Sequence, residues 1–156
     1  MLQGRKFTKE DALKKIKHYC SYQERCHNEV KENLYAYGLR KKEVEEIIAE
    51  LIENNYLNEE RFAVQFAGGK FRMKQWGRKK IQYELQQKGV NDFIIKIALK
   101  EIDEEKYFET LQKLAQTKWN ALNVENNLVR QSKTSAWLLQ KGYEQSLISQ
   151  VIRGLR

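Results

Sequence analysis

The sequence predicts an all-α protein made of three tandem three-helix repeats, with helix-turn-helix-like units in an elongated, curved array. Three observations predict it: 156 residues contain no proline, only 8 are glycine, and apolar residues recur at helical spacing around three of those glycines. Proline removes a backbone donor and breaks helix interiors, so its absence fits a chain that is helical throughout. The length suits about one domain, and a hydrophobic content of 41% suits an ordinary core.

The repeats become visible when three stretches, 30–51, 81–102 and 134–155, are aligned on a glycine. The glycines are 51 and 53 residues apart: Gly38, Gly89 and Gly142. Each has a leucine four residues before it: Leu34, Leu85 and Leu138. Each is followed at once by an apolar residue: Leu39, Val90 and Tyr143. Further apolar residues stand 6, 10 and 13 positions after each glycine, beginning with Val44, Ile95 and Ile148.

This pattern has a physical explanation. Spacings of 6, 10 and 13 lie on one face of a 3.6-residue helix. A glycine just past a helix supplies the left-handed residue that ends it, and the next apolar side chain can fold back on the last turn. Asn91 and Asp92 follow Val90 and are suited to begin the next helix. Each stretch is therefore predicted to contain a helix, a tight glycine turn and a second helix.

A longer amphipathic helix is predicted before each pair, over about 9–20, 59–73 and 104–119. The predicted organisation is a tail and three repeats: 1–8, 9–57, 58–102 and 103–156. A unit of this size has a small core, so neighbouring repeats should pack against each other. The alternative is a single compact bundle of nine helices in which the repeats record only ancestry.

The segment KFRMKQWGRKK, residues 70–80, is the strongest candidate binding surface. Six of its eleven residues are basic and none is acidic. Basic residues interleaved with aromatic ones suit phosphate contact, and tryptophan can stack on a base, although core packing is the simpler role for Trp76. The candidate residues for binding a partner or nucleic acid are Lys70, Arg72, Lys74, Trp76, Arg78, Lys79, Lys80 and Lys88.

The distribution of charge also favours an anionic partner. The net charge is +8, yet residues 43–60 carry 7 acids and no base, and 61–99 carry 9 bases and 2 acids. A concentrated basic region attracts anions at long range. The alternative is that the lysines serve solubility. The acidic helix, 43–54, is interpreted as a solvated face.

Several classes of function find no support in the sequence. Four possible zinc ligands, His18, Cys20, Cys26 and His27, have the wrong spacing for a metal site. No phosphate-binding glycine loop, metal-carboxylate motif or activated nucleophile is recognisable, so no enzyme activity, cofactor or small-molecule substrate is predicted. No apolar run could span a bilayer and no secretory signal is visible, so a cytoplasmic protein is expected.

Two segments, NNYLNEERFAVQF and KQWGRKKIQYELQQKGV, carry a family resemblance. They resemble the central signature of the RecX regulatory proteins, most specifically in the middle third of the chain. The structural residues of that signature appear here as Tyr56, Leu57, Asn58, Arg61, Phe62, Gly77, Leu85 and Gly89. Gly68 and Gly69 depart from the family and leave open whether their helix is straight, because glycine weakens helix interiors.

The resemblance implies a bacterial regulator without enzyme activity. Its implied partner is the RecA recombinase, chiefly as a filament on DNA, whose ATPase, strand-exchange and coprotease activities it would inhibit or modulate in homologous recombination, DNA repair and the SOS response. Weak, non-specific binding to single- or double-stranded DNA is also expected. The alternative is a stand-alone, non-specific DNA-binding helical protein that competes for DNA.

Overall fold

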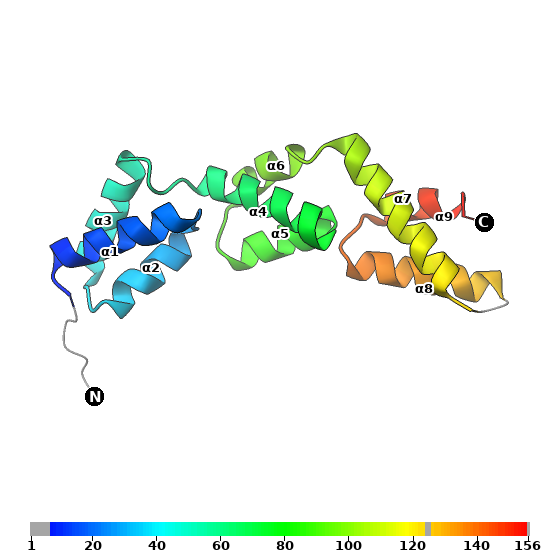
Figure 1. Cartoon of the computed structure of the whole chain (residues 1–156), viewed down its shortest axis with the longest axis horizontal. Coiled ribbons are helices and arrows are strands. Elements are labelled where there is room, and N and C mark those ends of the chain that lie inside the picture. The colour runs from blue at the N-terminus through cyan, green and yellow to red at the C-terminus, as the bar shows by residue number, and fades with distance from the viewer. Residues whose placement is uncertain (1–6, 124–125, 156) are drawn as a thin grey trace, which may run out of the picture. The chain divides into compact units, whose positions relative to one another are not determined.

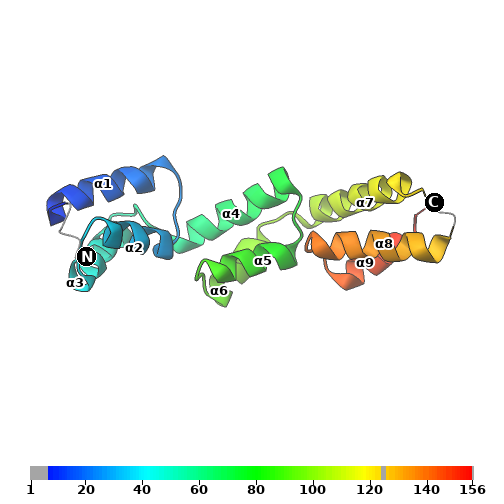
Figure 2. The same ribbon diagram turned by 90° about the horizontal axis from the view of Figure 1, so that it is seen from below.

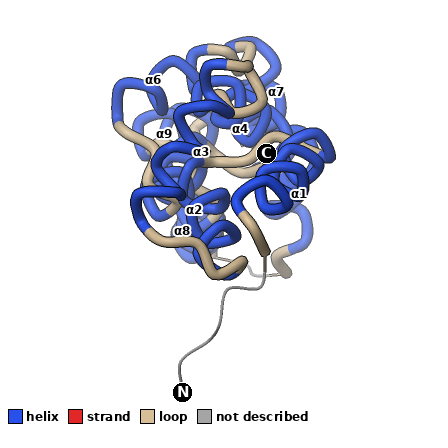
Figure 3. Tube along the Cα trace, turned by 90° about the vertical axis from the view of Figure 1, so that its left-hand side faces the viewer, coloured by secondary structure: helices blue, strands red, loops and turns tan. Residues whose placement is uncertain are grey.

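The computed structural model describes residues 7–123 and 126–155, and these residues form helices joined by short loops (Figure 3). Within them the helices, labelled in Figure 1, are α1 Lys9–Tyr22, α2 His27–Ala36, α3 Lys41–Glu53, α4 Glu59–Lys74, α5 Arg78–Gln87, α6 Asp92–Lys100, α7 Glu104–Ala121, α8 Asn127–Gln140 and α9 Gln145–Ile152. No strand occurs in this part of the chain, and the all-α prediction is confirmed.

Polar side chains define where many of the helices begin. Thr8 Oγ1 accepts a hydrogen bond from the N–H of Asp11 at 3.1 Å, and Asn58 Oδ1 accepts one from Arg61 at 2.9 Å. Asn91 caps α6 in the same way, by accepting from Ile94 at 2.9 Å. Such bonds satisfy N–H groups that the first turn leaves without a helical partner.

The predicted glycine turns are present in all three repeats. Gly38, Gly89 and Gly142 have φ angles of 90°, 83° and 100°, the left-handed region that glycine adopts without strain. The following apolar residue is buried each time, and its N–H donates back to the carbonyl of the leucine four residues before the glycine: Leu39 to Leu34, Val90 to Leu85 and Tyr143 to Leu138. A left-handed glycine followed by a buried apolar residue that bonds back to the helix is the helix ending that the spacing predicted.

The chain divides into two compact units, and the first comprises Met1–Gln65 and Leu85–Ile95. Here α1, α2 and α3 pack against one another, as Figure 2 also shows. Their core is formed by residues that include Ile16, Leu34, Ile47, Leu51 and Leu57. The outer face of the acidic helix is not only solvated: Glu46 and Glu50 of α3 pair with Lys9 and Lys17 of α1 at 2.9 and 3.8 Å.

The second unit comprises Phe66–Glu84 and Lys96–Arg156. In it α7, α8 and α9 pack against one another. The rings of Phe71, Tyr107 and Tyr143 form a buried row, with centroids 5.7 and 5.2 Å apart along it. Helices α4, α5 and α6 each contribute residues to both units, so the middle repeat is shared between them.

Other expectations have mixed outcomes. Helix α4 is continuous through Gly68 and Gly69. The repeat boundaries 9–57, 58–102 and 103–156 stay a prediction, and residues 1–6 of the predicted tail lie outside the described residues. Among the described residues, no helix has the length and apolar content needed to span a bilayer.

Candidate partner-binding surface

The basic segment 70–80 forms the corner between α4 and α5. Helix α4 ends at Lys74, and Gln75 takes a left-handed conformation with φ 57°. The N–H groups of Gln75 and Trp76 donate back to the carbonyls of Phe71 and Lys70 at 3.0 and 3.4 Å. The chain therefore turns sharply, which distributes the basic residues around a corner rather than along one helix face.

Trp76 lies half-buried at this corner between two lysines. Its ring meets Phe66 edge to face with centroids 6.4 Å apart, which supports the packing role. The amines of Lys70 and Lys80 stand 5.1 and 4.7 Å from its centroid. Both distances are within the range of a cation–π interaction, so the indole holds two positive charges beside each other.

Arg78 differs from its basic neighbours because its charge is used inside the chain. Its guanidinium donates to Glu144 and to Glu104, each at 2.7 Å, and lies 3.9 Å from the ring centroid of Tyr107. Burial opposes its charge, but the hydrogen bonds that it donates to the two carboxylates raise the pKa of Arg78 above its usual value. Only 18% of the side chain is exposed. Arg78 therefore has a structural role in this unit, and its charge is paired with two carboxylates of the chain.

Tyr107 and Glu144 complete the network around Arg78. The Tyr107 hydroxyl donates to Glu144 and accepts from the backbone N–H of Arg78, the latter at 2.9 Å. Burial, together with the Glu144 charge, raises the pKa of Tyr107 above its usual value, so the phenol stays neutral. The network joins α5, α7 and the α8–α9 turn.

Lys141 joins the corner although the sequence analysis did not select it. Its amine donates to the carbonyl of Lys74 at 3.3 Å and stands 5.3 Å from the ring centroid of Trp137. Burial lowers the pKa of Lys141, and the nearby charge of Lys80 lowers it further. A signal did exist, because Lys88 and Lys141 both immediately precede the aligned glycine of their repeat.

The remaining candidates fall into two groups. Arg72, Lys74 and Lys79 are exposed, and the Arg72 guanidinium lies across Gly68. Lys88 belongs to the first compact unit, whereas the other candidates belong to the second. We define the basic surface as six residues around Trp76: Lys70, Arg72, Lys74, Lys79, Lys80 and Lys141. Among the described residues, none of the six forms an ion pair with a carboxylate.

The residues of the expected family signature have structural positions. Leu57, Phe62 and Leu85 are buried, and Asn58 caps α4. Arg61 pairs with Glu24 and donates to Asn55 at 3.1 Å. The Lys17 amine stands 5.4 Å from the ring centroid of Tyr56. Gly77 and Gly89 stand where a Cβ would lie 2.3 Å from a neighbouring atom. These residues stabilise the fold of the repeats through packing, capping and internal hydrogen bonds.

The histidine and cysteine cluster does not assemble a metal site in the part of the chain that is described. Cys20 and Cys26 are buried, and burial raises the pKa of each thiol to about 11. Thiols with such pKa values remain protonated near neutral pH and are poor metal ligands and nucleophiles.

Comparison with known proteins gives the family. Residues 58–99 match the family model for the RecX second three-helix domain, and residues 104–152 match the model for the third. The chain belongs to the RecX family. The regulatory protein RecX of Clostridium perfringens is 34% identical over 129 residues, 81% of this chain and 60% of that protein. RecX of Oceanobacillus iheyensis is 29% identical over 136 residues, 87% and 50% of the two chains.

Solved RecX structures have the same fold. The crystal structure of RecX from Lactobacillus salivarius, 26% identical, matches with a TM-score of 0.87 over 94% of this chain and 96% of that one. A crystal structure of regulatory protein RecX that is 22% identical matches with a TM-score of 0.83 over 92% and 70% of the two chains. This chain spans about half to three fifths of the length of the curated RecX relatives. The all-α repeat fold and the family resemblance are both confirmed.

Proposed function

We propose that this RecX family member binds the RecA recombinase, most effectively as its filament on DNA, and restrains ATP hydrolysis, strand exchange and coprotease activity. The protein would act in the cytoplasm, without catalysing a reaction itself, in homologous recombination, DNA repair and the SOS response. The observation that carries the proposal is the basic surface, because six cations around Trp76 lack a carboxylate partner within the described residues.

The basic surface suits a filament in which DNA phosphates and acidic protein groups lie close together. Lys70 and Lys80 are held in position by Trp76, so less side-chain freedom is lost when they bind an anion. Burial lowers the pKa of Lys141, and repulsion from the nearby charge of Lys80 lowers it further. A phosphate or carboxylate placed between them would relieve that repulsion, which favours an anionic partner at this corner.

The test is the single-stranded-DNA-dependent ATPase of the cognate recombinase, titrated with this protein. The variant Lys70→Gln/Lys74→Gln/Lys79→Gln/Lys80→Gln removes four charges and leaves Arg78 in place. A matched control, Lys96→Gln/Lys100→Gln/Lys106→Gln/Lys113→Gln, removes four exposed charges outside the basic surface. We expect wild type and control to inhibit below saturation of the DNA, and the basic-surface variant to need at least tenfold more protein.

Two outcomes would contradict the proposal in different ways. Equal inhibition by both variants would retain the regulator but exclude this surface as its contact. Inhibition only at DNA saturation, relieved by added naked DNA and steeply dependent on salt, would identify the non-specific DNA-binding alternative.

A further inference from the structure

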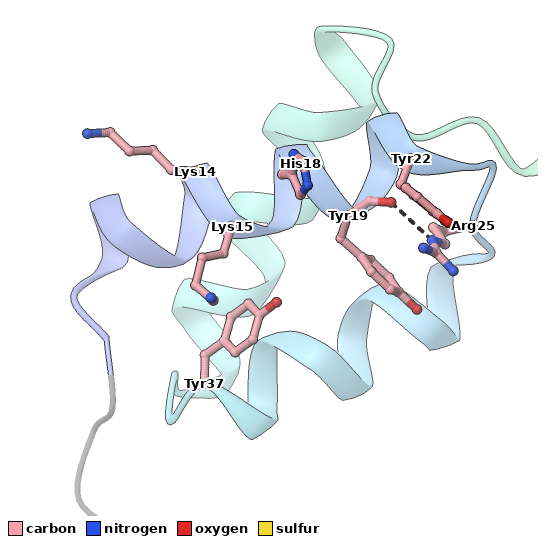
Figure 4. Close-up of a pocket in the computed structure, with 7 residues that line it drawn as sticks. All are labelled: Lys14, Lys15, His18, Tyr19, Tyr22, Arg25 and Tyr37. Carbon is pink, nitrogen blue, oxygen red and sulfur yellow. Dashed lines mark hydrogen bonds between the residues drawn. The ribbon is translucent and has the colours of Figure 1, made fainter.

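A second group of cations and aromatic rings lies in the first compact unit and has no part in the basic surface. It lines a pocket of about 450 Å³ between α1 and the ends of α2, shown in Figure 4. The lining residues are Lys14, Lys15, His18, Tyr19, Tyr22, Arg25 and Tyr37. Pockets of this size are typical of small-ligand sites.

The charge of the pocket is not balanced by its own lining. No carboxylate lines it, and Lys14, Lys15 and Arg25 form no ion pair within the described residues. By contrast, Lys9 and Lys17 on the same helix are paired with Glu46 and Glu50 of α3. Helix α1 therefore has one side neutralised by α3 and another side that remains cationic at the pocket.

Aromatic rings form the walls of the pocket. Figure 4 shows the side chains of Tyr19 and Tyr37 next to each other in the space between α1 and α2, with Lys15 pointing toward Tyr37. The Arg25 guanidinium lies 3.6 Å from the Tyr19 ring centroid, and its Nε donates to the Tyr19 carbonyl at 3.1 Å. Tyr37 is held edge to face by Phe7, with centroids 5.3 Å apart. Tyr22 is 78% exposed at the rim.

The rings are also electrically suited to an anionic ligand. Burial raises the pKa values of Tyr19 and Tyr37, so both phenols stay neutral and do not repel a phosphate. Lys15 and Arg25 each stand beside an aromatic ring. Rings that stack on bases beside cations that hold phosphates are the arrangement by which proteins bind single-stranded nucleic acid.

We propose that this pocket binds single-stranded nucleic acid, with one base against the tyrosines and its two flanking phosphates at Lys15 and at Arg25, which lie at opposite ends of the pocket (Figure 4). The inference extends the proposed function, because a recombinase filament carries single-stranded DNA. It rests on that function for the biological source of the DNA, whereas binding to the pocket can be tested separately. An acidic peptide would use the cations but leave three tyrosine rings without a stacking partner, so a nucleotide fits the lining better.

The first experiment is photocross-linking of the full chain to a short oligothymidylate that carries 5-iodouracil, followed by mass spectrometry. We expect cross-links to Tyr19, Tyr22 or Tyr37. Cross-links confined to Trp76 and Trp137, or none at all, would overturn the proposal. The assay contains no recombinase, so its result is independent of the ATPase test, and either proposal can fail alone.

The second experiment measures the affinity for the same labelled oligonucleotide by fluorescence anisotropy. The variant Lys15→Gln/Tyr22→Leu changes two exposed residues of the pocket, and Lys31→Gln/Tyr35→Leu makes the same chemical change on exposed positions outside it. We expect the pocket variant to bind about fivefold more weakly or worse, since a lost base–aromatic stack alone is a change of that order, and the control to bind like wild type. Equal loss in both variants would overturn the proposal.

Two ligand controls test the role of the base. An abasic oligonucleotide of the same length should bind wild type at least fivefold more weakly than oligothymidylate. Equal affinity for the two, or equally effective competition by polyglutamate, would show that the pocket only attracts negative charge and would overturn a nucleotide site. Circular dichroism of both variants verifies that they are folded.

Discussion

The two places where one repeat meets the next are built on the same plan with different chemistry. In the first joint, the start of α2 (Cys26, His27, Asn28) meets Glu59 of α4 and the Lys88–Gly89 turn. In the second joint, the start of α5 (Gly77, Arg78, Lys79) meets Glu104 of α7 and the Lys141–Gly142 turn. Residues 26–28 and 77–79 both stand 12 to 10 positions before the aligned glycine of their repeat, and Lys88 and Lys141 both immediately precede theirs, so the joints are directly comparable.

The difference lies in how closely the backbones approach. At the second joint the N–H groups of Gly77 and Lys79 donate to the carbonyls of Lys141 and Gly142, both at 2.8 Å. A Cβ on Gly77 would lie 2.3 Å from Gly142, so this approach is open to glycine and closed to a residue such as Cys26. At the first joint a side chain makes the contact instead, because Asn28 Nδ2 donates to the Lys88 carbonyl at 3.0 Å.

The second joint therefore depends on a glycine, whose lack of a side chain lets two backbones meet. The first joint depends on the side chain of Asn28, which bonds across it. The second joint also has the Arg78 network, where the first has His27 at the corresponding position. The second joint should therefore be more sensitive to substitution, and the following predictions test that difference.

The largest effect is expected for Gly77→Ala. The new methyl group would overlap backbone atoms, which cannot move as a flexible side chain could, so we expect a loss of about 3 kcal/mol in the free energy of unfolding. The measurement is urea unfolding followed by circular dichroism. Gly69→Ala is the matched control: its Cβ meets nothing within 4 Å inside α4, and alanine should stabilise the helix by about 0.5–1 kcal/mol. A loss for Gly77→Ala no larger than the effect of Gly69→Ala would show that the close approach at Gly77 is unimportant.

A smaller loss, about 2 kcal/mol, is expected for Arg78→Gln. The substitution removes the cation that neutralises Glu144, a carboxylate with only 24% of its side chain exposed. His27→Gln at the first joint should change stability by less than about 0.5 kcal/mol. The reason is that His27 bonds Glu59 through its backbone N–H at 2.8 Å, which glutamine retains. Thermal unfolding of the two variants side by side gives the comparison, and equal losses would contradict it.

Smaller effects than that of Arg78→Gln are expected at the paired positions Asn28 and Lys79. Asn28→Ala removes the side-chain bond to Lys88 and should cost about 0.5–1 kcal/mol, because the site is exposed. Lys79→Ala keeps its backbone bond to Gly142, so stability should change by less than about 0.3 kcal/mol. Urea midpoints of the two variants decide this, and a larger loss for Lys79→Ala would refute the distinction between side-chain and backbone contacts.

Much of the local structure was predictable. Helices expected over 59–73 and 104–119 are Glu59–Lys74 and Glu104–Ala121. The glycine turns, the buried residue after each and the Asn91 cap also followed from spacing. These features depend on interactions within about one helical turn, which a sequence shows directly.

The candidate site was only partly predictable. In the sequence Arg78 is adjacent to its basic neighbours, but one of its carboxylate partners, Glu144, lies 66 residues away. Lys141 was overlooked for the same reason, since it meets Lys74 across 67 residues. The tyrosine pocket was not predicted, although its residues come from α1, the loop after it and Tyr37, which directly follows α2. Its shape depends on the packing of those two helices.

The helical class, the repeat and the turn at each glycine follow from the order of the residues, since backbone sterics and apolar periodicity act over a few residues. Which charges are neutralised and which remain available depends on how the helices pack. Lys9, Lys17 and Arg78 have carboxylate partners brought in from other helices, whereas Lys15 and Lys80 lie beside aromatic rings. The physical reason is that the strength of an ion pair depends on distance and burial, and both are set by packing between segments far apart in the chain.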